Sequence, residues 1–387
     1  LITAASILFA VFFAIFMRAI QLGSYGNMVD NVVQAYTGYI QIFDHRYQED
    51  KVIDHSIDYK DGLLDKIEAH SNVTIAVPRL ESFALASSGT KTKGIMLVGT
   101  DPARDDELTN LSGKIVEGEY LKEGDTGLLV SQRLASYLKA GIGDTIVLIS
   151  QGYHGIGAAD QYKVQGIIKF PSPDLDNKMI FMDLGLCQEF YSAPDLISSV
   201  SLNLDNDNRL NQTVKDLQKS LGEQYEVKSW KTILTKLVQQ IEGDNAGGIL
   251  MLVLLYMIVG FGIFGTVQMM TTERRKEFGV MVAVGMQKTK LGGILIIEML
   301  LIGILGTLAG IVLSIPVVYE MYIHPITLSG EVAESIMSFG MEPIMPTAWE
   351  AGYFFSQAGV VLIIVSIAIF FPILGVTRLK VNKALRA

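Results

Sequence analysis

Four long apolar runs constrain the fold of this 387-residue chain more than any other feature. A helix needs roughly 20 mostly apolar residues to cross a hydrocarbon core of about 30 Å. The runs cover residues 1–17, 246–272, 291–319 and 351–377, and the third contains a single charged residue, Glu298. We therefore expect an α-helical membrane protein with four transmembrane helices.

The first run has a signal-peptide core as its alternative interpretation. It has no A-x-A-like cleavage site and further spans follow, which favours a membrane anchor. Because neither Met nor a basic segment precedes it, we expect further sequence upstream of residue 1. Whether an ATPase domain is fused there stays open.

Composition and motifs argue against several classes of function. The net charge of -9 argues against a nucleic-acid partner, which a basic face would recognise. A single cysteine, Cys187, excludes an internal disulfide, and no HxxxH, HExxH, P-loop or G-x-S-x-G motif occurs. We predict a non-catalytic protein with no catalytic, cofactor-binding or metal site in this chain.

Loop charges orient the four spans, because short cytoplasmic loops retain Lys and Arg. The connector 273–290 carries five basic residues, and the tail 378–387 carries four without an acid. The loop 320–350 has five Glu and no Lys or Arg. We therefore expect the connector and the tail in the cytoplasm, and the loop together with residues 18–245 on the other side.

The region between the first two spans alternates short β-rich runs with helical periods, which indicates a large α+β extracytoplasmic domain. Strands are expected at VTIAVPRL, GIMLVGT, GLLVS, DTIVLIS and YKVQGII. The predicted segments are a first transmembrane helix 1–17, a stalk helix 18–38, the domain 39–229, a stalk helix 230–245, a second transmembrane helix 246–272, a cytoplasmic helix 273–290, a third transmembrane helix 291–319, a loop 320–350, a fourth transmembrane helix 351–377 and a tail 378–387.

Two features of this domain have open interpretations. Residues 150–162 form a glycine-rich loop of about a dozen residues between two expected strands, with Tyr153 and His154 predicted to be exposed. Such a loop is either functional or a mobile tip. The second feature is an acidic cluster, which we predict to be a solvated turn, with cation binding as the alternative. Its members are Asp101, Asp105, Asp106 and Glu107.

The connector itself predicts a short helix. Thr271 or Thr272 can cap its start, Glu273 suits its first turn, and Gly285 can end it in a left-handed conformation. Its apolar residues are too few to span a membrane, and another surface has to cover them so that they are shielded from water. Membrane headgroups and a groove on a cytoplasmic protein remain equal alternatives for that cover.

Residues 273–318 read ERRKEFGVMVAVGMQKTKLGGILIIEMLLIGILGTLAGIVLSIPVV, which follows the pattern E-[KR]-[KR]-x-E-[IF]-G before a glycine-rich helix. This run resembles the permease core of the FtsX, LolC/LolE and MacB family, the type VII or mechanotransmission ABC transporters. VSQRLASYLKAGIGDTIVLIS and YKVQGII resemble its outer-domain signatures. GYIQIF is similar to the G-H-x-Q-I motif of LolC and LolE, with Tyr39 in place of His.

The resemblance implies that residues 273–285 are a coupling helix seated in an ATPase. Its implied contact residues are Glu273, Arg274, Arg275, Glu277, Phe278, Met281 and Gly285. Two ATPase subunits would hold the ATP and Mg, and the chain would pair with a second permease protomer as a homodimer or a LolC/LolE-type heterodimer. The implied location is the bacterial cytoplasmic (inner) membrane, with the large domain in the periplasm.

Small and charged residues of the third span have two interpretations each. Gly303, Gly306 and Gly310 allow close helix approach, either within the chain or at a subunit interface. An acid inside a span is a functional candidate, but Glu298 can also pair with a lysine.

Three functions follow from the resemblance. The first is a LolC/LolE-like permease that extracts a lipoprotein substrate from membrane lipid and passes it to a periplasmic carrier, with Tyr153 and His154 in the carrier loop. The second is MacB-like export of peptides or drugs. The third is FtsX-like signalling to a cell-wall hydrolase.

Overall fold

The computed structural model describes residues 2–47, 52–59, 62–338 and 342–377, with side chains up to residue 370. The predicted tail 378–387 lies outside the described residues. The chain forms two compact units. The helical unit contains Leu1–Asn27, Gln239–Leu328 and Ile344–Ala387, and the sheet unit contains Met28–Val238 and Ser329–Pro343.

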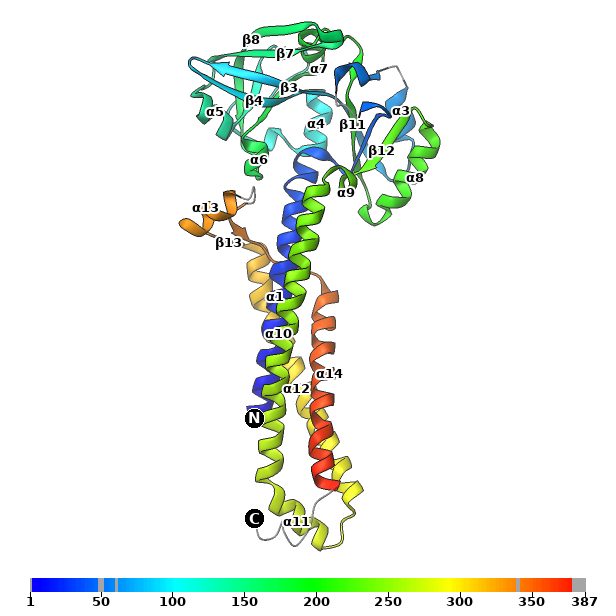
Figure 1. Cartoon of the computed structure of the whole chain (residues 1–387), viewed down its shortest axis with the longest axis vertical. Coiled ribbons are helices and arrows are strands. Elements are labelled where there is room, and N and C mark those ends of the chain that lie inside the picture. Colours follow the sequence, from blue (N-terminus) through cyan, green and yellow to red (C-terminus); the bar gives the residue numbers. More distant parts are fainter. Residues whose placement is uncertain (1, 48–51, 60–61, 339–341, 378–387) are drawn as a thin grey trace. The chain divides into compact units, whose positions relative to one another are not determined.

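Four long helices build the helical unit (Figure 1). They are α1 (Ile2–Asp30), α10 (Thr235–Glu273), α12 (Lys288–Ile323) and α14 (Ala351–Thr377). Within the described part of the chain, these four are long and apolar enough to cross a membrane. The helices extend beyond the expected apolar runs because helical hydrogen bonding continues through polar segments such as 235–245.

Buried side chains from all four helices form one core in this unit, including Val11, Ile263, Met299 and Val361. A short helix, α11 (Arg275–Ala283), connects α10 to α12, and a small β-ladder pairs β13 (Ile326–Thr327) with β14 (Ile344–Met345).

The sheet unit is built on one ten-stranded mixed sheet. Its strands are β1 (Ile40–Asp44), β3 (Val73–Ser88), β4 (Lys91–Thr100), β5 (Ile115–Gly118), β6 (Leu128–Ser131), β7 (Thr145–Gln151), β8 (Gly157–Ile168), β9 (Met179–Asp183), β11 (Ser199–Leu204) and β12 (Tyr225–Ser229). They run in the order β12-β1-β11-β3-β4-β9-β6-β8-β5, and β7 pairs with β3 and β8. Two further strands, β2 (Ile57–Asp58) and β10 (Leu196–Ile197), pair with each other.

The long strand β3 connects two hydrophobic cores. Its first half pairs with β11, where Val200 and Leu202 belong to a core shared with α3 and α8. Its second half pairs with β7, where Ile146 and Leu148 belong to a core shared with α5 and α7. All five strands expected from the sequence are present, and the predicted α+β class is confirmed.

Short helices pack against the strands of the sheet or lie in the connections between them (Figure 1). They are α3 (Leu63–Glu68), α4 (Pro102–Thr109), α5 (Gln132–Leu138), α6 (Pro173–Asp176), α7 (Leu184–Phe190), α8 (Leu210–Leu221) and α9 (Trp230–Ile233). A further short helix, α13 (Glu331–Ser338), follows β13 in the chain. Single helical turns are η1 (Val33–Thr37), η2 (Ile53–His55), η3 (Ser112–Lys114), η4 (Tyr153–Gly155) and η5 (Asp207–Arg209).

Candidate functional site

The helix α11 forms the corner between α10 and α12 (Figure 1). The predicted threonine cap is wrong: the Thr271 and Thr272 hydroxyls donate back to carbonyls of α10, and Arg274 occupies the N-cap position. The predicted end is confirmed, because Gly285 has φ +109° and its N–H donates to the Val282 carbonyl. Glycine reaches this backbone conformation without the strain that a Cβ would add.

One side of α11 packs against α12. Phe278 is only 1% exposed and lies in a cluster with Leu291 and Leu295 of α12. Met281 packs against the same cluster and is partly buried. The cover that the sequence required for Phe278 is therefore supplied by the chain itself, and this ring does not face outward.

Arg274 also turns inward. Its Nη1 donates to both carboxylate oxygens of Glu298, at 2.6 and 2.8 Å, and its Nε donates to Glu277 at 3.3 Å. The guanidinium carbon lies 5.5 Å from the centroid of the Phe278 ring. The expected pairing of Glu298 is confirmed, but its partner here is an arginine of the connector and not a lysine.

The opposite side of α11 faces outward. Val284 is 84% exposed, and Val280 and Glu277 are also exposed. The remaining predicted coupling residues, Glu273, Arg275 and Gly285, are exposed as well. These residues form the exposed surface of the corner, and we call it the outer face of α11.

The three glycines of α12 lie against other helices of the same chain. A Cβ at Gly306 would come within 2.9 Å of the Ala4 carbonyl oxygen, and one at Gly310 within 2.8 Å of the Leu8 carbonyl oxygen. A Cβ at Gly303 would meet Val365 of α14 at 3.0 Å. Intramolecular packing is therefore what the structure shows at these positions.

The predicted long loop at residues 150–162 is wrong. Strands β7 and β8 pair up to Gln151 and Gly157, so the connection is only five residues long. Main-chain hydrogen bonds along the glycine- and alanine-rich segment extend β8, a pairing that composition does not reveal.

The tip of this hairpin is tied to the rest of the sheet unit. The His154 N–H donates to Asp54 at 2.7 Å, and the Tyr153 N–H donates to the Tyr191 carbonyl at 2.8 Å. His154 is exposed as predicted, whereas Tyr153 is half-buried against the core. A contact of these two residues with a carrier stays a prediction.

The predicted solvated turn at Asp101–Glu107 is wrong for its central member. Asp105 and Arg79 are both fully buried, and two hydrogen bonds of 3.0 and 2.7 Å join them. Asp101 caps α4, and Asp106 accepts hydrogen bonds from Ser112. No group of His, Cys, Asp and Glu side chains suited to a metal ion is found among the described residues.

The buried pair also reaches the segment that follows α1. Arg79 Nη1 donates to the Tyr36 carbonyl at 2.6 Å, and the Tyr36 hydroxyl donates to Glu81 at 2.8 Å. Burial alone would lower the pKa of the Arg79 guanidinium, but Asp105 and Glu81 raise it above its ordinary value. Arg79 therefore stays charged and holds η1 to strand β3 and helix α4.

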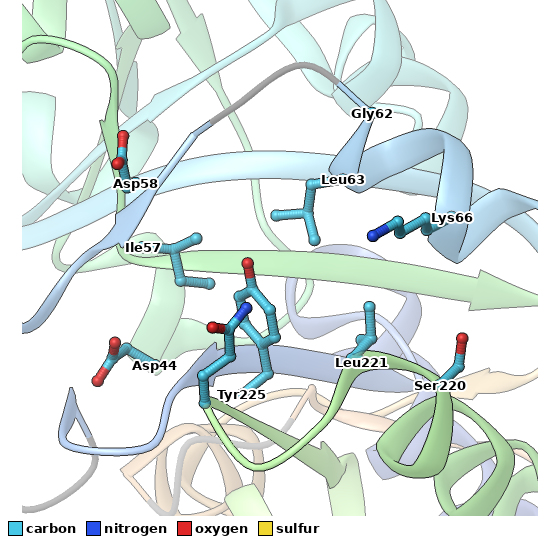
Figure 2. A pocket seen from close by; sticks show the side chains of 10 residues that line it. Asp44, Ile57, Asp58, Gly62, Leu63, Lys66, Ser220, Leu221 and Tyr225 are labelled. Atoms are coloured by element: carbon cyan, nitrogen blue, oxygen red, sulfur yellow. The ribbon is translucent and has the colours of Figure 1, made fainter.

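Figure 2 shows a pocket of about 350 Å³ in the sheet unit. Its lining mixes charged and apolar side chains, with Asp58 and Lys66 around Leu63 and Tyr225. Asp44, at its margin, accepts a 2.9 Å hydrogen bond from Arg46. Among the described residues that line it, no printed hydrogen bond joins a nucleophile to a base, and we assign this pocket no function.

One surface was missed by the sequence interpretation. Phe83 and Leu85 of β3 and Val147 and Ile149 of β7 are exposed, and Leu85 lies directly opposite Ile149. The opposite face of both strands is buried in the core. The unbroken apolar run IVLI in β7 was the available signal, because a half-exposed strand normally alternates apolar and polar residues.

Comparisons with known proteins cover almost the whole chain. The model of the MacB-like periplasmic core domain matches residues 1–220. The model of the FtsX-like permease C-terminal region matches residues 249–381, which include α11 and the last two long helices.

Individual relatives are distant. The lipoprotein-releasing system transmembrane protein LolC of Xylella fastidiosa (strain 9a5c) is 26% identical over 61% of this chain and 59% of its own length. The ABC transporter permease YtrF of Bacillus subtilis (strain 168) is 28% identical over 41% of this chain and 37% of its own length. The periplasmic region of MacB from Actinobacillus actinomycetemcomitans aligns with 54% of this chain and 95% of that structure, at 12% identity and a TM-score of 0.38. The chain thus spans about three fifths of the length of the LolC relative it matches.

Proposed function

Because the chain belongs to the ABC transporter permeases of the FtsX, LolC/LolE and MacB type, we propose that it converts ATP hydrolysis by a partner ATPase into motion of the sheet unit. The chain is a membrane protein, and its family pairs such permeases with an ATPase and a second permease. The sheet unit lies outside the cytoplasmic membrane in this proposal, and two ATPase subunits supply the ATP and Mg.

The observation that carries the coupling proposal is the two-sided packing of α11. Its inner side is fixed to α12 by Phe278 and Arg274, while Val280 and Val284 remain exposed on its outer face. Apolar side chains without a cover are typical of a protein contact surface. A groove of the ATPase would cover them, and ATP-driven movement of that groove would displace α11.

A substitution on the outer face tests this contact. We expect Val284→Asp to abolish co-purification of the ATPase, because a carboxylate would be desolvated in the groove. Val116→Asp is the matched control, since Val116 is an exposed valine of β5 in the sheet unit. Co-purification that is equal for both variants would place the ATPase elsewhere.

For the substrate, we propose extraction of a lipoprotein from the membrane and transfer to a soluble carrier. The similarity to LolC supports this choice. The exposed apolar strip on β3 and β7 gives the sheet unit a surface on which such a carrier could dock, close to the hairpin that carries Tyr153 and His154.

Reconstitution tests the substrate. The chain, its second permease and its ATPase in proteoliposomes should release a diacylated lipoprotein to a soluble carrier only when ATP is hydrolysed. We expect Ile149→Lys to reduce this transfer, whereas Val116→Lys should leave it unchanged. Stimulated ATP hydrolysis without any release would contradict lipoprotein extraction.

The second candidate is MacB-like export of peptides or drugs, which the match of residues 1–220 to the MacB-like periplasmic core domain favours. In that case, the same proteoliposomes should fail to release lipoprotein. ATP hydrolysis should instead respond to a peptide or drug together with an adaptor protein.

A further inference from the structure

The contacts of Arg274 indicate a second route by which motion of α11 can reach the long helices of the helical unit. The residue lies between two helices, because α10 ends at Glu273 and α11 begins at Arg275. Its φ and ψ of -89° and 6° break the helix there, so the backbone forms a corner. Through the backbone, α11 is therefore connected to α10 by a single non-helical residue.

The Arg274 side chain closes this corner onto a third helix. It contacts Glu298 of α12 with two short hydrogen bonds and Glu277 of α11 with a third. Arginine suits this position because a planar guanidinium can hold two carboxylates in fixed directions, which an ammonium does not.

Glu298 continues the contact surface that buries Phe278. Leu291, Leu295 and Glu298 are spaced by four and three residues and therefore lie on one face of α12. Leu291 and Leu295 pack on Phe278, and Glu298 meets Arg274 one turn further along. The interaction thus extends over about two turns of α12 and combines apolar packing with an ion pair.

Glu298 lies near the start of α12, which is a helix apolar enough to cross a membrane. Arg274 and Glu298 keep 36% and 32% of their side-chain surface exposed, so the pair can separate without leaving fully buried charges. The pair therefore joins α11 to α12 without being part of a buried core.

We propose that Arg274 and Glu298 are positioning residues that make α11 and the start of α12 move as one body. This inference rests on the proposed coupling function and adds to it. Displacement of α11 would pass to the long helices through α12 as well as through α10. Arg274 would then act inside the permease, and the ATPase would contact the residues of the outer face.

Spin-label distances test the rigid body without any ATPase. Labels would be placed at the exposed positions Lys276 of α11 and Leu301 of α12 by Lys276→Cys and Leu301→Cys, since Cys187 is buried. We expect a narrow distance distribution in the parent protein and a broad one in Arg274→Gln and Glu298→Gln. The charge swap Arg274→Glu with Glu298→Arg should make it narrow again.

The same variants are then measured in the complex with its ATPase. We expect each single variant to retain ATPase binding but to lower the substrate released per ATP hydrolysed by about fivefold or more, with recovery in the charge swap. The inference would be overturned if the single variants kept the narrow distance distribution and the parent ratio of substrate released to ATP hydrolysed. It would also be overturned if the charge swap restored neither quantity. Failure of the parent protein to bind the ATPase would instead reject the proposed function. The distances measured without ATPase would still decide whether α11 and the start of α12 move as one body.

Discussion

Two of the arginine–carboxylate pairs among the described residues differ sharply in burial. Arg79 and Asp105 in the sheet unit are fully buried and belong to a network with Tyr36 and Glu81. Arg274 and Glu298 in the helical unit keep about a third of their side-chain surface exposed. The chemistry of the two pairs is the same, but their surroundings give them different roles.

The difference in burial predicts whether the loss of each pair lowers the stability of the fold or changes how the corner moves. Breaking a buried pair leaves a charge without water or a partner, so the loss appears as lower stability of the fold. Breaking a partly exposed pair lets water replace the partner, so the loss in stability is small. We therefore expect the first pair to fix the sheet unit and the second to govern how motion passes through the corner.

The largest effect is expected for Asp105→Asn, which leaves the Arg79 guanidinium buried without its counter-charge. The free energy of unfolding of the sheet unit should fall by about 3–5 kcal/mol. Urea unfolding followed by the fluorescence of Trp230, which lies in a core of this unit, measures it in a Trp349→Phe background.

The exposed pair of Asp174 and Lys178 supplies the control for this variant. Asp174→Asn should cost about 0.5 kcal/mol or less, because exposed pairs of this spacing contribute little. Equal losses for Asp105→Asn and Asp174→Asn would show that burial does not distinguish the two environments.

Close helix packing should matter more for the stability of the helical unit than its ion pair. A Cβ at Gly310 would overlap the Leu8 carbonyl oxygen and Val11 of α1, so Gly310→Ala should cost about 1–3 kcal/mol. Gly293→Ala on the same helix meets no atom within 4 Å and should be neutral or stabilising. Thermal unfolding of the two variants in detergent compares them, and an equal response would contradict the packing.

A pH effect on stability is expected next to the buried pair, at Lys114. Burial lowers the pKa of the Lys114 ammonium to about 8, with Asp105 and Asp106 partly opposing the shift. The unfolded chain then binds more protons than the folded one between this value and about 10.4, so stability rises with pH through that window.

Between pH 7 and 9 the gain in unfolding free energy should be about 1 kcal/mol. The same Trp230 fluorescence measures it, and Lys114→Met should remove it. A gain that persists in Lys114→Met would assign the effect to another group.

The smallest effect on stability is expected for Glu298→Gln. Its partly exposed ion pair should contribute only about 0.2–1 kcal/mol to the unfolding free energy of the helical unit. Thermal unfolding against the parent protein measures it. A loss as large as that of Asp105→Asn would make the corner pair a structural element and remove its distinction from the buried pair.

Local patterns in the sequence predicted much of the fold. Apolar runs of sufficient length predicted the four long helices, short β-rich runs predicted five strands, and Gly285 predicted the end of α11. Each of these depends on neighbouring residues or on the period of one element, which a single sequence contains.

The pairings that define the candidate site depend on the tertiary fold. Arg79 and Asp105 are 26 residues apart in the sequence, and Arg274 and Glu298 are 24 apart. The sequence shows these charged residues, but it does not show which of them contact each other. The inward direction of Phe278 likewise depends on α12 folding back along α11. The hairpin of β7 and β8 was misjudged because main-chain pairing can continue through Gly157 and Ala158 without a β-rich composition.

The central claim is that a partner ATPase seats on the outer face of α11. Its most direct test places a photo-crosslinking residue at Val284 of the full chain, co-expressed with its ATPase in intact membranes. The account predicts a crosslink to the ATPase whose yield changes when a non-hydrolysable ATP analogue is added to the isolated membranes, and none from a control at Val116. Crosslinks to lipid alone, or to the ATPase equally from both positions, would contradict it.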